Sequence, residues 1–158
     1  MKKGSNKGTT TVSGIKEQNR VFNFLNDFGL NVVQKTNKKE YIRSRLWNKN
    51  NRGKHDVVLY KNENRICIEV KYIGPVAGST DEKIPFLPYE ASQCDDWGDV
   101  FIIYVSGHIE RENIVQKIDC AKSESERWSN DKFKIFVVTS DNELITKINS
   151  LQCLCKIA

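Results

Sequence analysis

The chain has no long hydrophobic run. None of its apolar stretches approaches the roughly 20 residues that cross a bilayer, and residues 1–5 lack the apolar character of a secretory signal. We therefore expect a soluble, cytoplasmic protein with no membrane partner.

The chain also lacks closely paired cysteines. It has five cysteines, an odd number, and no two of them are spaced as CxxC. Neither a disulfide framework nor a zinc site is indicated by such a set. We expect reduced thiols, several of them in the core, at Cys67, Cys94, Cys120, Cys153 and Cys155.

No internal repeat divides the 158 residues, and this length fits one compact domain with a buried core. Residues 1–11 are almost entirely Lys, Gly, Ser, Asn and Thr, which cannot bury apolar area. We expect a mobile basic arm at residues 1–11 and a single domain over residues 12–158.

Acidic residues are scarce in the first third of the chain. Residues 1–54 hold 13 Lys and Arg against 3 Asp and Glu, whereas the remaining residues hold 12 against 17. This asymmetry indicates a surface that binds a polyanion. A solvated basic face that serves only solubility would give the same counts, so charge alone does not decide.

Hydrophobic periodicity predicts alternating helices and strands. A helix begins near Ser13, a plausible N-cap, and ends at Gly29. Its apolar stripe should consist of Ile15, Val21, Phe22, Leu25 and Phe28. Further strands are expected at residues 30–33, 56–60, 66–71, 100–105 and 133–138, and further helices at 89–96, 110–128 and 141–151. This order predicts an α/β fold with a mixed central sheet flanked by helices.

Two stretches show no sustained period. Residues 34–54 are polar and basic, which predicts a long surface loop or a ragged hairpin. Residues 74–88 contain two glycines and three prolines, which predicts a shaped loop without a regular helix.

The most specific pattern is a hairpin of two β-branched runs, residues 56–60 and 66–71. A turn centred on Asn62 and Glu63 would place Asp56 opposite Glu69, with Cβ atoms about 4.5–5.5 Å apart. Two carboxylates at that distance repel each other unless a cation lies between them, and such oxygen ligands suit Mg²⁺.

Strand alternation adds a cation to this pair. Lys71 should lie on the same face as Glu69, because the two residues are separated by one position. The apolar residues of the strand, Ile66, Ile68 and Val70, should point to the opposite face. Two acids and an ammonium group therefore converge.

Asp56, followed after twelve residues by Glu69, Val70 and Lys71, resembles the PD-(D/E)xK signature of the restriction-endonuclease-like nucleases. The appearance is nearest to type II restriction and phage-type members. Residues 78–86 look like the Gly-Ser-Thr loop with a following Lys-x-Pro of some members. His55 stands where the signature commonly has proline, a departure that removes no metal ligand.

The resemblance implies a restriction-endonuclease-like core, a four-stranded mixed sheet with helices on both sides, and hydrolysis of DNA phosphodiester bonds. Asp56, Glu69 and the carbonyl of Val70 would bind Mg²⁺, for which Mn²⁺ should substitute. Lys71 would orient the attacking water and stabilise the charge that develops on the phosphate. Glu17 matches an acidic residue that many members carry on the first helix, although an exposed helical glutamate is also ordinary.

Cations and aromatic residues interleave just before Asp56, which predicts phosphate contacts beside the scissile bond. Gln93 lies near a position where family members often carry glutamine. The expected DNA-binding residues are Arg43, Arg45, Lys49, Arg52, Lys54, Lys83 and Gln93. A solvated loop remains the alternative for the basic stretch.

The resulting hypothesis is an intracellular, Mg²⁺-dependent DNA endonuclease of bacterial or phage-like type. It would act as a homodimer or with a larger recognition subunit. Two alternatives share the fold: a structure-selective nuclease such as a Holliday junction resolvase, and an inactive DNA-binding module. A surface hairpin charged only to block edge pairing is the structural alternative for the motif.

Overall fold

The computed structural model describes the backbone of residues 12–45, 48–94 and 100–151. Side chains are described in these ranges except at residues 44–52. The expected basic arm at residues 1–11 lies outside these ranges. Within them, no helix combines the length and the apolar character needed to cross a membrane.

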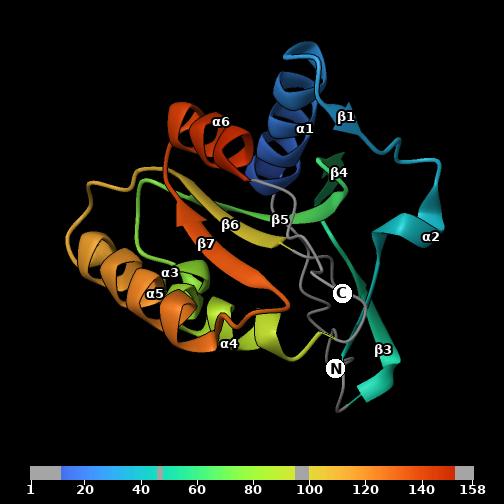
Figure 1. Ribbon diagram of the computed structural model, residues 1–158. Coiled ribbons are helices and arrows are strands. Elements are labelled where there is room, and N and C mark those ends of the chain that lie inside the picture. Colours follow the sequence, from blue (N-terminus) through green and yellow to red (C-terminus); the bar gives the residue numbers. More distant parts are fainter. Residues whose placement is uncertain (1–11, 46–47, 95–99, 152–158) are drawn as a thin grey trace, which may run out of the picture.

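A five-stranded sheet forms the centre of the molecule, in the order β1-β4-β5-β6-β7 (Figure 1). Its strands are β1 (Asn31–Val32), β4 (Val57–Lys61), β5 (Asn64–Ile73), β6 (Val100–Gly107) and β7 (Lys134–Val138). β4 pairs antiparallel with β1 and β5, whereas β5, β6 and β7 run parallel. The sheet is mixed as predicted. Its five strands match the five that periodicity predicts, one more than the four that the resemblance implies.

Helices cover both faces of this sheet, as Figure 1 shows. One face carries α1 (Val12–Asp27) and α6 (Asp141–Ser150), and the other carries α3 (Ser79–Lys83), the 3₁₀ turn η1 (Ile84–Phe86), α4 (Leu87–Ser92) and α5 (Ile114–Trp128). Each helical layer buries its own apolar cluster against the sheet. The predicted α/β architecture is confirmed.

Residues on β5 alternate between these two layers. Ile66, Ile68 and Val70 pack with α1 and α6, while Cys67 and Ile73 pack with the opposite layer. Because side chains alternate along a strand, Glu69 and Lys71 lie on the face of Cys67 and Ile73. The predicted sidedness of the strand is confirmed for its apolar residues.

The turn between β4 and β5 has the predicted centre. Asn62 and Glu63 both have positive φ, 50° and 67°, as a two-residue type I′ hairpin requires. The register pairs Tyr60 with Arg65 and Val57 with Ile68. One further step along the hairpin brings Asp56 beside Glu69.

Residues 79–88 contradict the expectation of a loop without regular helix. They contain α3, η1 and the start of α4, because the prolines fall where helices tolerate them. Pro85 and Pro88 each occupy one of the first two positions of their turns. The helix expected over residues 89–96 begins earlier, at Leu87, and ends at Ser92.

The apolar stripe of α1 is narrower than predicted. Val21 and Leu25 are fully buried, but Ile15 and Phe28 are 48% and 55% exposed. Phe28 follows the last helical residue and packs beside Phe24, with ring centroids 6.1 Å apart. The helix therefore packs against the sheet mainly with its C-terminal half.

A separate two-stranded hairpin projects from the body of the molecule (Figure 1). It follows α2 (Lys38–Tyr41) and consists of β2 (Ile42–Arg45) and β3 (Asn48–Lys54), with an irregular register between Arg43 and Arg45. Of the two predictions for residues 34–54, the ragged hairpin is thus confirmed.

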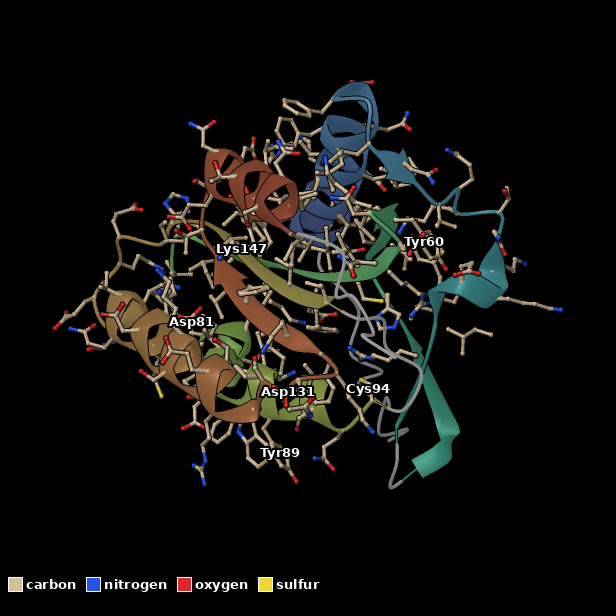
Figure 2. All side chains as sticks on the ribbon, in the orientation of Figure 1. Tyr60, Asp81, Tyr89, Cys94, Asp131 and Lys147 are labelled. Atoms are coloured by element: carbon tan, nitrogen blue, oxygen red, sulfur yellow. The ribbon has the colours of Figure 1, made fainter. Side chains whose placement is uncertain are left out.

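α2 connects this hairpin to the sheet. Tyr60, labelled in Figure 2, donates a hydrogen bond of 2.7 Å to Glu40, and Arg65 also pairs with Glu40. The hydroxyl of Tyr41 donates to the carbonyl of Val33 at 2.5 Å.

The described cysteines take part in no disulfide among the described residues, as expected. Cys67 and Cys94 are buried, whereas Cys120 is exposed. The predicted thiols at residues 153 and 155 lie outside the described ranges.

Candidate active site

Three charged side chains meet where β4 begins beside β5. Asp56 occupies the bend before β4, while Glu69 and Lys71 lie two residues apart on β5. The ammonium of Lys71 is 2.7 Å from Glu69 Oε1. Hairpin register and strand alternation thus bring together the three residues that the sequence singles out.

Asp56 is fixed against the backbone of β5. Its Oδ2 accepts a hydrogen bond of 2.8 Å from the amide of Val70. Burial and the charge of Glu69 raise the pKa of Asp56 to about 7, although the Val70 amide, Lys71 and Lys35 act in the opposite direction. The two carboxylates therefore repel each other, as a pair prepared for a cation would.

Lys71 remains a cation at this site. Burial lowers its pKa, but the charge of Glu69 and the bond to that carboxylate outweigh burial, so the pKa lies above its ordinary value. A lysine held in this state stabilises negative charge and does not serve as a base at neutral pH.

Arg43 supplies a second cation to Glu69. Its Nη1 atom lies 3.3 Å from Glu69 Oε2, so each carboxylate oxygen faces a different positive group. Arg43 comes from β2, where it pairs across the hairpin with Gly53. Glu69 is only 8% exposed, so water offsets little of its negative charge. Among the described residues, Lys71 and Arg43 are the cations that offset it.

Lys35 also contacts the site, although the sequence pattern does not single it out as a site residue. Its ammonium donates to the backbone carbonyl of Asp56 and lies 4.2 Å from the ring centroid of Tyr41. Burial lowers its pKa despite the charge of Asp56. No signal distinguishes Lys35 from its neighbours Lys38 and Lys39, because its role depends on how residues 33–41 pack against β4.

His55 lies beside the site in an apolar position. It is 2% exposed, and its ring approaches Phe101 edge-on with centroids 6.1 Å apart. Burial, with the charges of Arg65 and Arg43, lowers its pKa to about 3, so the ring is neutral. Neither ring nitrogen bonds to any residue in the described part of the chain.

Glu17 belongs to a different network. It pairs with Arg20 on α1 and accepts a hydrogen bond of 3.1 Å from Ser106 on β6. Arg20 continues to Asp141 on α6, with distances of 2.9 and 3.1 Å to the two carboxylate oxygens. The partners of Glu17 within the described ranges are thus Arg20 and Ser106, so the structure does not join it to the three charged residues of the site.

The other predicted DNA-binding residues lie on the β2–β3 hairpin, on α3 and just after α4. Lys54 is exposed at the end of β3, and Lys83 is exposed at the end of α3. Gln93 bonds its neighbour Ser92 at 3.2 Å. Arg45, Lys49 and Arg52 belong to the β2–β3 hairpin, with side chains outside the described set.

The donor set of the site fits a hard divalent cation. In the ranges that the structure describes, no three His, Cys, Asp or Glu side chains form a cluster that could hold a metal. Mg²⁺ commonly uses only one or two protein carboxylates, together with waters and substrate phosphate. Asp56 and Glu69 meet that requirement, and their mutual repulsion favours a cation between them.

The comparison with protein families gives one match. The family model described as a PD-(D/E)XK nuclease superfamily domain matches residues 9–149. No curated protein and no solved structure matches the chain. The matched range contains every element from α1 to β7 and nearly all of α6.

Proposed function

The chain belongs to the PD-(D/E)XK nuclease superfamily, and from this premise we propose that it is a metal-dependent DNA endonuclease. The superfamily typically uses divalent metal ions, and its activity implies a nucleic-acid substrate. One observation carries the proposal: Asp56 lies beside Glu69 with its pKa raised to about 7, and Lys71 is 2.7 Å from Glu69.

In this proposal, Asp56 and Glu69 hold Mg²⁺ together with the carbonyl of Val70, and Mn²⁺ can replace it. An ion held there would supply Lewis-acid polarisation of the scissile phosphate and activation of the attacking water. Lys71 places its ammonium beside that phosphate and stabilises the negative charge that develops there. The raised pKa of Lys71 supports this electrostatic role.

The β2–β3 hairpin supports DNA as the substrate. It brings five cations of the predicted surface to one projecting element, namely Arg43, Arg45, Lys49, Arg52 and Lys54. Arg43 contacts Glu69, which supports a role of the hairpin in holding the phosphate backbone next to the carboxylates. Glu17 and Gln93 have a weaker claim, because their described partners lie elsewhere, and Lys83 lies on α3, outside the hairpin.

The test is cleavage of supercoiled, linear and branched DNA, with and without Mg²⁺. We expect Mg²⁺-dependent breaks that Asp56→Ala or Glu69→Ala abolishes, because either change removes a ligand. Asp131→Ala is a matched control, since Asp131 is exposed on another part of the surface (Figure 2). Activity of either site variant within tenfold of the parent would contradict the assignment.

The same assay separates the alternatives. Cutting confined to branched DNA would identify a structure-selective nuclease. Binding of duplex without cleavage under Mg²⁺ or Mn²⁺ would identify an inactive DNA-binding module.

A further inference from the structure

Glu69 has more cationic partners than one carboxylate needs. Lys71 lies 2.7 Å from Oε1 and Arg43 lies 3.3 Å from Oε2, so both oxygens are engaged. A metal ion held by Asp56 and Glu69 requires one of these oxygens. Each oxygen has a second lone pair, but a divalent ion repels both neighbouring cations, which favours release of the more weakly bound one.

We propose that Arg43 exchanges partners: its guanidinium binds Glu69 in the metal-free protein and moves to a DNA phosphate when the metal ion binds. This inference rests on the proposed function and adds to it a coupling between the two ligands. Arg43 then prevents tight metal binding in the absence of DNA.

The bond lengths show which cation yields. Charge-assisted hydrogen bonds are commonly about 2.7–2.9 Å long. The Lys71 contact falls in this range, whereas the single Arg43 contact at 3.3 Å is longer and uses only one guanidinium nitrogen. Lys71 is thus the firmly bound partner and Arg43 the loosely bound one.

Arg43 is also left incompletely satisfied. Its side chain is 16% exposed, and its Nε atom is buried without a hydrogen-bond partner among the residues described. A buried donor without a partner costs free energy, and a phosphate can accept two parallel bonds from a guanidinium. Transfer to phosphate therefore improves the bonding of Arg43.

Gly53 gives the guanidinium its place on the hairpin. A Cβ atom at Gly53 would lie 3.1 Å from Arg43 Nη2 and 3.2 Å from Nε, so the guanidinium rests directly on the glycine backbone. The hairpin that aims Arg43 at Glu69 also carries the other cations expected to meet DNA. Phosphate bound to the hairpin is therefore within the same local region as the exchange.

Electrostatics makes the two binding events cooperative. A divalent ion at Asp56 and Glu69 repels the guanidinium, and a nearby phosphate attracts it. Because coupling between two ligands is reciprocal, DNA that takes Arg43 must tighten metal binding, and metal must tighten DNA binding.

The test is calorimetric titration of the full chain with Ca²⁺, with and without duplex DNA. We expect Arg43→Gln to tighten Ca²⁺ binding to the free protein by about fivefold or more, and to reduce the further tightening by DNA. Arg43→Met is the second variant, since it keeps the apolar stem if Gln disturbs packing. Arg65→Gln is the matched control, because Arg65 pairs with a different carboxylate, that of Glu40.

Unchanged or weaker Ca²⁺ binding in both Arg43 variants would overturn the exchange, provided that Glu69→Gln abolishes binding. Ca²⁺ binding that survives Glu69→Gln would instead overturn the proposed metal site, and the exchange with it. Equal tightening in Arg65→Gln would assign the effect to loosening of the hairpin and would also overturn the exchange.

Discussion

At the scale of single residues, the candidate site places two carboxylates close together in the folded protein. Asp56 and Glu69 are largely buried. The neighbouring cations offset only part of their negative charge. Such an arrangement costs stability in the free protein and becomes favourable when a cation arrives.

The pKa of Asp56 leads to a prediction about stability. Its folded-state pKa is about 7, above its ordinary value of 3.8, so ionisation of Asp56 opposes folding as the pH rises between these values. Asp56→Asn removes this charge and keeps an acceptor for the Val70 amide. In EDTA at pH 8 we expect the variant to unfold with a free energy higher by about 2–4 kcal/mol.

Urea denaturation at pH 4 and pH 8 checks this expectation. The difference between Asp56→Asn and the parent should be small at pH 4, where Asp56 is protonated in the folded protein. Mg²⁺ should reduce or reverse the difference at pH 8, because the parent has the better ligand. An equal difference at both pH values would exclude Asp56 as its source, and Asp131→Asn serves as the exposed control.

Lys71 leads to a kinetic prediction. Lys71→Ala should retain Ca²⁺ binding, because both carboxylates remain, but lose single-turnover cleavage by about 100-fold or more, as removal of a transition-state donor does. The measurement combines calorimetry with single-turnover rates, and Lys132→Ala controls for loss of an exposed lysine. Normal turnover would remove Lys71 from the mechanism.

At the scale of elements, the β2–β3 hairpin and the β4–β5 hairpin have different proposed roles. The β4–β5 hairpin belongs to the central sheet and carries Glu69 and Lys71, with Asp56 directly before it, whereas the β2–β3 hairpin projects beside the sheet (Figure 1). Residues of α2 join the two, through Glu40 with Tyr60 and Arg65. The proposed catalytic residues thus lie at the sheet, and the expected DNA contacts lie on a separate hairpin.

We predict that replacing Arg45, Lys49 and Arg52 together by Ala weakens DNA binding and flattens its salt dependence. The slope of log K against log salt should fall by about 0.9 for each phosphate that the variant no longer neutralises. Arg43 stays in place, so the test is independent of the exchange at Glu69.

The control variant removes three lysines from the opposite edge of the sheet. Lys122, Lys134 and Lys147 line a groove of about 480 Å³ beside β7 (Figure 2 labels Lys147). Both triple variants lose the same charge, so only the position differs. An unchanged slope in the hairpin variant, or equal effects in both, would place the DNA surface elsewhere.

For the molecule as a whole, the described chain offers one candidate site. Under the proposed function, one such site would hydrolyse one strand at a time, so a double-strand break would require two copies or a partner subunit. A homodimer with two-fold symmetry is the simplest arrangement, and a larger recognition subunit is the other.

We expect the protein with duplex and Ca²⁺ to sediment as two chains on one DNA, and Mg²⁺ to produce double-strand breaks. Sedimentation velocity of the free protein and of the Ca²⁺ complex, over a range of protein concentrations, provides the measurement. A single chain on DNA that only nicks would contradict the homodimer and favour dependence on a recognition subunit.

Much of the site is determined by local sequence. Alternation in residues 66–70 determines which face of β5 is apolar, and the turn at Asn62 and Glu63 determines the register. These two local features suffice to bring Asp56, Glu69 and Lys71 together. The mixed sheet with helices on both faces is predicted in the same way, from hydrophobic periodicity over short segments and from the residues that end each segment.

The remaining contacts depend on tertiary packing. Arg43 on Glu69, Lys35 on Asp56 and Glu17 on Ser106 join residues 26, 21 and 89 positions apart. Long, flexible side chains reach partners that depend on how whole elements pack, and no periodicity records that packing. Local sequence therefore determines the carboxylate pair and Lys71, whereas tertiary packing places the further cations, Arg43 and Lys35, beside them.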